Sequence, residues 1–136
     1  MFAPYPVPDM RYRHPKIPGV DNNCLFCRIV AGEIPATVVY ETDTTLAFRD
    51  IDPKAPVHVL VIPKEHHPDV VSLTRSDPAG AADLLAAASA VAEAEGLLID
   101  GFRLLFNTGE YAGQEVFHVH GHVLGGGPLG PMLVPR

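Results

Sequence analysis

Three histidines at every second position, His118, His120 and His122, are the residues of this chain with the clearest chemical potential. They lie in an apolar run that closes with Val123 and Leu124. On a strand, this spacing directs all three imidazoles to one face of the sheet. Groups that titrate near neutral pH are poor core residues, so the run indicates either a metal site or a nucleophile with supporting imidazoles. From the spacing alone, both interpretations stay open.

The composition limits the kinds of partner that the chain can take. Its 136 residues predict one domain, and its formal net charge of −6 argues against a general nucleic-acid or acidic-membrane surface, since both need a basic stripe. We see neither a secretory leader pattern nor an apolar run long enough to cross a bilayer. We therefore expect a cytoplasmic protein that binds neither nucleic acid nor membrane.

The elements that must position the histidines can be read from turn residues and apolar periodicity. Residues 1–20 are rich in proline and predict a flexible tail, and residues 21–136 predict a single domain. Asp21 or Asn22 can cap a short helix from about Cys24 to Ala31. The remaining elements are a hairpin over 37–41 and 45–49, a central strand over 57–62, a long helix between Asp77 and Gly96, and strands over 102–106 and 116–124.

This order predicts an α+β fold, with an antiparallel sheet of about five strands and one long and one short helix on one face. His58 is the only polar residue of the central strand. The strand that is expected over 116–124 carries all three histidines of the run. No internal repeat and no second domain are visible.

The histidine run also matches the signature of the histidine triad (HIT) family, His-φ-His-φ-His-φ-φ with φ apolar, except that Gly121 takes the second φ position. Further blocks resemble the Hint branch of that family, in its bacterial form. They are, in order, Ile34-Pro35, Ala47-Phe48-Arg49-Asp50-Ile51, Pro56-Val57-His58, Ile62-Pro63-Lys64, Asn107, Gly113-Gln114-Glu115-Val116 and Gly126-Gly127-Pro128-Leu129-Gly130-Pro131-Met132. The likeness implies a homodimer with a continuous sheet through both subunits, in which each C-terminal segment reaches toward the partner's site.

The resemblance implies hydrolysis of purine nucleoside 5′-phosphoramidates or aminoacyl adenylates through a nucleotidyl-histidine. His120 matches the nucleophile, and a neutral imidazole is chemically suited to that role. Its other ring nitrogen must then carry the proton, and we expect it to donate to a backbone carbonyl. His58 and His122 are expected to contact the phosphate or the leaving group, and Gln114 to add a neutral donor.

The resemblance further implies a purine slot, a ribose-binding carboxylate at Asp50 and a phosphate loop in which Gly113 lets backbone amides approach. The implied substrate-binding residues are Phe26, Ile29, Phe48, Asp50, Ile51, Asn107, Gly113, Gln114, Glu115, Val116, His120 and His122. The apolar ones would be ordinary core residues in another fold. Glu115 stands where the family often has serine, which leaves its side chain without an assigned role.

Zinc-containing members of the family take ligands at positions that match Cys24, Cys27, His66 and His118. Two thiolates and two imidazoles make a closed tetrahedral set, so the implied zinc is structural. The alternative is two free thiols and a solvated loop histidine. His14 and His67 fit no part of the pattern and are expected at the surface.

Three other functions remain open from the sequence. One is the diadenosine polyphosphate hydrolysis of other HIT proteins, which the Gly-Gly-Gly-Pro-Leu-Gly ending disfavours. Another is a nucleotide-binding, zinc-stabilised interaction protein without catalysis. The third is a redox metal enzyme that uses all three triad histidines, which leaves Cys24 and Cys27 unexplained.

Overall fold

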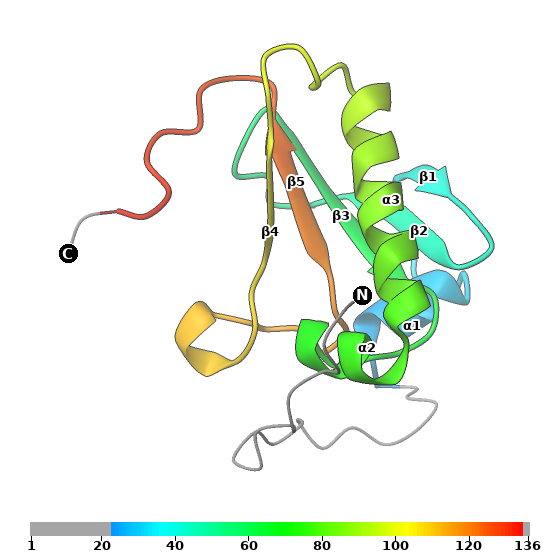
Figure 1. The fold of residues 1–136 in the computed structure, drawn as a ribbon. Helices are drawn as coiled ribbons and strands as arrows, with labels where there is room; N and C mark the ends of the chain where they lie inside the picture. The colour runs from blue at the N-terminus through cyan, green and yellow to red at the C-terminus, as the bar shows by residue number, and fades with distance from the viewer. Residues whose placement is uncertain (1–22, 135–136) are drawn as a thin grey trace, which may run out of the picture.

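The computed structural model describes residues 23–134, in which five strands form one antiparallel sheet in the order β1-β2-β3-β5-β4 (Figure 1). The strands are β1 (Val38–Glu41), β2 (Thr45–Arg49), β3 (Val57–Pro63), β4 (Arg103–Phe106) and β5 (Gly121–Gly125). The helices are α1 (Leu25–Val30), α2 (Val70–Ser76), α3 (Pro78–Ala94) and the 3₁₀ turn η1 (Glu110–Ala112). The predicted α+β class, antiparallel sheet and strand number are confirmed.

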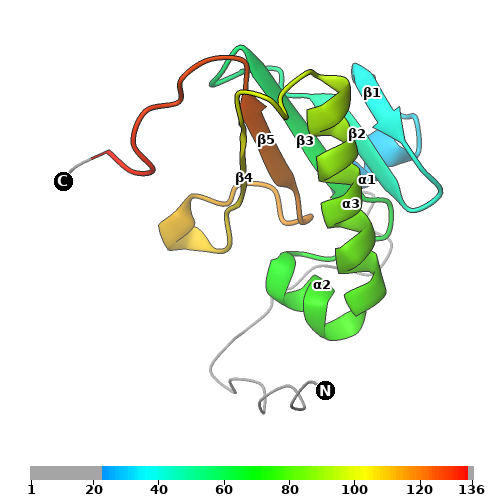
Figure 2. The ribbon, with the colours of Figure 1, turned by 45° about the horizontal axis from the view of Figure 1, so that its top comes forward.

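The long helix α3 crosses one face of the sheet, as Figures 1 and 2 show. Asp77 caps its first turn by accepting from the Gly80 amide at 3.0 Å, and Pro78 occupies a first-turn position that needs no amide. The core beneath α3 includes Leu84 and Val91 of the helix and Val59 of the central strand, all at most 1% exposed.

The opposite face of the sheet is covered by α1, which corrects the expectation of helices on one face only. Phe26 of α1 packs in a second cluster with Phe48 and Leu60, whereas Ala47 and Val59 belong to the cluster beneath α3. Successive residues of a strand point to opposite faces, so a central strand that is apolar on both faces requires cover on both sides. The short helix supplies that cover.

Two local features differ from the expectation. Helix α2 was not predicted; its N-cap Asp69 accepts from the Ser72 amide at 2.9 Å, and the helix ends at Asp77, which also starts α3. The N-cap of α1 is Cys24, whose Sγ accepts from the Cys27 amide at 3.3 Å. The cap predicted at Asp21 or Asn22 and the proposed tail lie outside the described residues.

The third difference concerns the histidine run. Strand β5 begins only at Gly121, so His122 alone of the three histidines lies in regular strand. Gly121 pairs with Phe106 of β4, and a Cβ built on Gly121 would lie 3.0 Å from the Phe106 ring. A side chain at this position would require the Phe106 ring to shift by a few tenths of an ångström, which favours glycine within the histidine signature. Within residues 23–134, no helix is long and apolar enough to cross a membrane.

Candidate active site

His118, His66 and the two cysteines form a cluster of four potential metal ligands. The ligand atoms of Cys24, Cys27, His66 and His118 all lie within 4.8 Å of one another. Cys24 Sγ is 3.4 Å from His118 Nδ1, Cys27 Sγ is 3.2 Å from His66 Nδ1, and the two Nδ1 atoms are 3.2 Å apart. Ligand atoms around one tetrahedral zinc are separated by roughly 3.3–3.8 Å, given its bond lengths. The four residues could therefore hold a metal ion.

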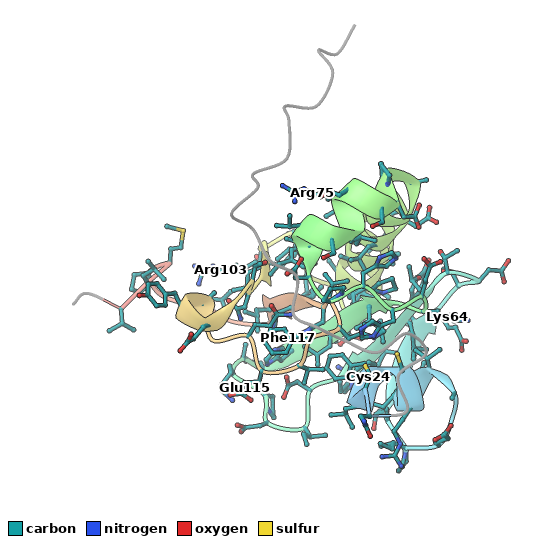
Figure 3. The ribbon with its side chains drawn as sticks, turned by 90° about the horizontal axis from the view of Figure 1, so that it is seen from below. Cys24, Lys64, Arg75, Arg103, Glu115 and Phe117 are labelled. Carbon is teal, nitrogen blue, oxygen red and sulfur yellow. The ribbon has the colours of Figure 1, made fainter. Side chains whose placement is uncertain are left out.

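The tautomer of His118 fits this cluster. Its Nε2 lies 2.8 Å from the Pro63 carbonyl oxygen, which can only accept, so Nε2 carries the proton. Nδ1 is left with a lone pair that faces the two cysteines. The whole residue is 0% exposed, and the ring of Phe26 packs edge-on against it with centroids 6.0 Å apart. The view from below in Figure 3 shows Cys24, the N-cap of α1, beside the segment that carries Phe117, which leads into His118.

His120 points away from the metal-ligand cluster. Its Nδ1 is 2.8 Å from the carbonyl oxygen of His118, so Nδ1 donates, as expected, and Nε2 keeps its lone pair. Phe26 meets the His120 ring edge-on with centroids 5.1 Å apart, which restricts the orientation of the imidazole. Nε2 is thus an oriented, unprotonated nitrogen.

His58 and His122 are joined in a directed hydrogen-bond chain. The Lys54 amide donates to His58 Nδ1 at 3.0 Å, so the proton of His58 is on Nε2. His58 Nε2 in turn lies 2.8 Å from His122 Nδ1 and donates to it. His122 must then carry its proton on Nε2, and that atom is buried with no hydrogen-bond partner among the described residues. The chain ends in a donor whose hydrogen bond is unused among the described residues.

The histidines near this site are held neutral. Burial lowers the pKa of His118 and of His122 to about 4 and also lowers the pKa of His58 and His120. The Asp50 carboxylate opposes this change at His58, His120 and His122, but desolvation dominates. At neutral pH these histidines therefore present lone pairs and N–H donors rather than positive charges.

A cleft of about 420 Å³ opens beside these rings. Of the residues expected to bind substrate or to act in catalysis, the cleft is lined by Phe26, Asp50, His58, Asn107, Gly113, Gln114, Glu115, Val116, His120 and His122. Asp50 Oδ1 accepts from the Asp52 amide at 2.7 Å, and Oδ2 lies 3.5 Å from His58 Nε2. This places a carboxylate at one end of the cleft and imidazoles next to it.

Three residues expected in the purine slot lie elsewhere. Phe48 is buried behind Phe26, with ring centroids 5.4 Å apart, and Ile29 packs against the same apolar cluster. Ile51 is 102% exposed. Neither Ile29, Phe48 nor Ile51 lines the cleft. The apolar wall comes instead from strand residues on the α1 face of the sheet.

Sequence reasoning missed four lining residues, Lys54, Leu60, Leu105 and Leu124. The signal for two of them was present. Leu60 and Leu124 each lie two positions after a cleft histidine on the same strand, so they share its face.

Gln114 has a different setting from the one expected. Its Oε1 accepts from the Gly109 amide at 2.9 Å, and its Nε2 donates to the carbonyls of Pro68 and Val116 at 2.8 and 3.1 Å. Both side-chain donors are engaged by main chain, so Gln114 fixes the loop before the triad. Gly113 at φ 76° lies in the left-handed region, with open space where a Cβ would be.

His67 is not a surface residue, contrary to expectation. It is 6% exposed, and its carbonyl accepts from the Val119 amide at 2.7 Å. The segment after β3 therefore turns inward at His66 and His67 and attaches to the segment that carries the triad. The other histidine expected at the surface, His14, lies outside the described residues.

Comparisons with known proteins agree with this geometry. The model of the HIT domain matches residues 31–129. The purine nucleoside phosphoramidase of Escherichia coli K12 is 45% identical over 112 residues, covering 82% of this chain and 94% of that protein. A HIT family hydrolase from Legionella pneumophila Philadelphia 1 superposes with a TM-score of 0.75 at 50% identity, covering 79% of this chain and all (100%) of that one.

A HIT family hydrolase from Clostridium thermocellum gives a TM-score of 0.79 at 46% identity, covering 83% of this chain and 98% of that chain. The family match includes all five strands, the helix α3 and the histidine run. The chain therefore belongs to the HIT family, in its bacterial Hint-like branch, and is a hydrolase of the HIT type.

Proposed function

We propose that this protein hydrolyses purine nucleoside 5′-phosphoramidates or aminoacyl adenylates, and that His120 forms a nucleotidyl-histidine intermediate. The observation that carries the proposal is the oriented lone pair on His120 Nε2, which follows from the 2.8 Å hydrogen bond between Nδ1 and the His118 carbonyl. The name of the Escherichia coli relative supports the substrate class.

The first chemical step is attack of His120 Nε2 on the α-phosphorus. The new N–P bond forms as the bond from phosphorus to the leaving group breaks. In a phosphoramidate this is the P–N bond, and the leaving amine takes a proton from solvent; in an aminoacyl adenylate it is the P–O bond, and the amino acid leaves as its carboxylate. The imidazole of His120 becomes cationic, and its Nδ1–H bond to the His118 carbonyl strengthens with that charge. The carbonyl thus stabilises the intermediate more than the free enzyme.

The second step is attack of water on the same phosphorus. The bond to His120 breaks, a proton returns to solvent, and the products are the nucleoside monophosphate and free enzyme. His122 Nε2–H, at the end of the chain from Lys54 through His58, is suited to donate to a phosphoryl oxygen as negative charge gathers there. Asp50, which lines the same cleft, is suited to accept from a ribose hydroxyl.

We further infer that the cluster of Cys24, Cys27, His66 and His118 holds a structural zinc ion. A closed set of two thiolates and two imidazoles leaves no open position for substrate, so zinc would supply folding free energy and no chemistry. The protein's own contribution to the reaction comes from the histidines that face the cleft.

We also propose a cytoplasmic homodimer. Strand β4 is an edge strand that offers unpaired backbone groups to a second sheet. The segment after β5 leads away from the sheet past β4 in Figure 1, and the Arg103 guanidinium donates to its Gly130 carbonyl at 3.1 Å. This direction is compatible with a C-terminal segment that reaches a neighbouring subunit. Light scattering of the purified protein measures the assembly.

The test compares turnover of adenosine phosphoramidates, aminoacyl adenylates and diadenosine polyphosphates by the parent protein and by His120→Ala. We expect turnover of the first two classes, a loss of several orders of magnitude in the variant, and retained AMP binding. Mass spectrometry of a quenched reaction should place the nucleotidyl group on His120. Preferred cleavage of diadenosine polyphosphates, an adduct on another residue, or binding without turnover would each overturn the proposal.

A further inference from the structure

A second group of potential metal ligands lies outside the active site and outside the Cys24–His118 cluster. It consists of Glu65, His67 and Asp77, whose ligand atoms lie within 4.8 Å of one another. Glu65 and His67 follow the end of β3, and Asp77 joins α2 to α3. Figure 2 shows that α2 and the first turn of α3 meet at the lower end of the molecule. Neither the expected reaction nor the expected zinc site uses these residues.

His67 supplies the observation that points to a ligand. Its side chain is 7% exposed, and its Nε2 is buried with no hydrogen-bond partner among the described residues. Glu65 Oε1 is only 3.2 Å from that nitrogen, yet the two atoms are not aligned as a hydrogen bond. A buried ring nitrogen beside an unaligned carboxylate is costly unless something bridges them.

The spacing suits a shared cation. Two ligands bound to one metal ion at about 2.1 Å are roughly 3.4 Å apart in tetrahedral geometry and roughly 3.0 Å apart in octahedral geometry. The 3.2 Å between His67 Nε2 and Glu65 Oε1 falls between these values. Asp77 uses Oδ1 to cap the Gly80 amide, which leaves Oδ2 as its further acceptor.

The ligand set indicates the class of ion. Two carboxylates balance the charge of a divalent cation, and one imidazole favours a first-row transition metal over Ca²⁺ or Mg²⁺. The absence of thiolate distinguishes this group from the sulfur-rich cluster around Cys24, which selects a softer ion. We propose that Glu65, His67 and Asp77 bind a divalent first-row transition metal ion, with Mn²⁺ as the probe of this site.

Such an ion would connect two parts of the fold that carry functional residues. Glu65 and His67 flank His66, and the His67 carbonyl accepts from the Val119 amide, next to His118. Asp77 fixes the start of α3. A bound ion would hold the loop after β3 against the junction of α2 and α3, and it would thereby steady the segment that carries the triad.

The experiment titrates Mn²⁺ into the full-length protein, purified with its resident metal, and follows free Mn²⁺ by electron paramagnetic resonance. We expect one Mn²⁺ per chain and a rise in melting temperature with Mn²⁺. Glu65→Gln removes an exposed carboxylate, and Asp77→Asn removes the charge but retains an effective N-cap. Each variant should weaken Mn²⁺ binding at least tenfold.

Glu93→Gln, an exposed change of the same charge on α3, is the matched control and should bind Mn²⁺ like the parent. Melting curves without Mn²⁺ identify any loss of folding in the two test variants. Two results would overturn the proposal. One is no binding below about 1 mM Mn²⁺, which would make Glu65 and His67 a simple ion pair; the other is equal weakening in the control, which would indicate nonspecific attraction to the net charge.

Discussion

The pH dependence of turnover tests whether burial keeps the histidines neutral. Burial lowers the pKa of His122 from 6.5 to about 4. Placing a proton on this residue in the folded protein therefore costs about 3 kcal/mol more than in a model peptide. At pH 5.5 the neutral fraction of His122 is roughly 97%, whereas an imidazole with an unperturbed pKa would be roughly 9% neutral.

We expect kcat/KM for an adenosine phosphoramidate to stay nearly constant from pH 7 to pH 5.5 and to fall as the pH approaches 4. The profile of kcat/KM reports ionisations of the free enzyme, and the apparent value belongs to the coupled group of His58, His120 and His122. Phosphoramidates hydrolyse spontaneously in acid, so a blank without enzyme is needed at each pH. A midpoint near 6.5 would refute the argument from burial.

The same shift makes a prediction for stability, with a defined sign. The unfolded chain takes up a proton at His122 below about pH 6.5, whereas in the folded chain His122 is protonated only as the pH approaches about 4. This contribution to stability is therefore complete above pH 6.5 and is lost as the pH falls from 6.5 toward 4. The loss relative to neutral pH amounts to about 1.4 kcal/mol at pH 5.5. Circular dichroism at each assay pH shows whether the protein is still folded.

A variant at Asp50 tests independently the direction in which this carboxylate shifts the pKa values of the histidines. The Asp50 carboxylate raises the pKa of His58, His120 and His122, so Asp50→Asn should move the acid limb to still lower pH. KM should rise in the same variant if Asp50 binds ribose. Asp83→Asn, an exposed change on α3, is the matched control. An acid limb that moves to higher pH in Asp50→Asn would show that the carboxylate does not act through the imidazoles.

Three further outcomes are expected. Elemental analysis should find one zinc per chain in the parent protein. The variant Cys27→Ser should lose zinc and melt at a lower temperature. A chelator that stops turnover while the fold stays intact would contradict a structural role for zinc. Leu84→Ala should cost about 2–5 kcal/mol in denaturant unfolding, because this side chain is 1% exposed, whereas Leu85→Ala, at a position 52% exposed, should cost less than about 0.5 kcal/mol. Deletion of residues 128–136 should change the ranking of leaving groups in kcat/KM more than the affinity for AMP; equal losses for every substrate, with weaker AMP binding, would show that the segment only stabilises the fold.

The fold was predictable where strong local signals agreed. Asp77 and Pro78 marked the start of the long helix, and the strand that is apolar on both faces was correctly predicted to be central. The helix that covers the second face was wrongly expected on the first, because α1 is too short for its apolar face to be read from sequence. Helix α2 was missed because its seven residues carry no long periodicity, and its cap at Asp69 resembles an ordinary loop residue.

Most of the residues that line the cleft were predictable from motif order, but the hydrogen bonds among them were not. His58 and His122 were expected beside His120, yet the direction of the hydrogen-bond chain depends on the Lys54 amide, which no side-chain pattern encodes. Similarly, Phe48 was assigned to the purine slot, but strand alternation and the position of α1 place Phe26 in front of it. The motif identifies which residues belong near the site, but which of them reach the cleft surface depends on how the helix packs on the sheet.

His118 contacts the cysteines through its imidazole and His120 through its main-chain carbonyl, and this separation affects how the protein can evolve. The imidazole belongs to the metal-ligand cluster, whereas the carbonyl orients His120. Every amino acid supplies a carbonyl, but few supply the ligand. A lineage can therefore discard the cysteines and the imidazole at position 118 without discarding control of the nucleophile, provided that packing still holds the main chain in place. If the cluster holds zinc and His120 is the nucleophile, as proposed, metal binding and catalysis could be lost independently, although both depend on residue 118.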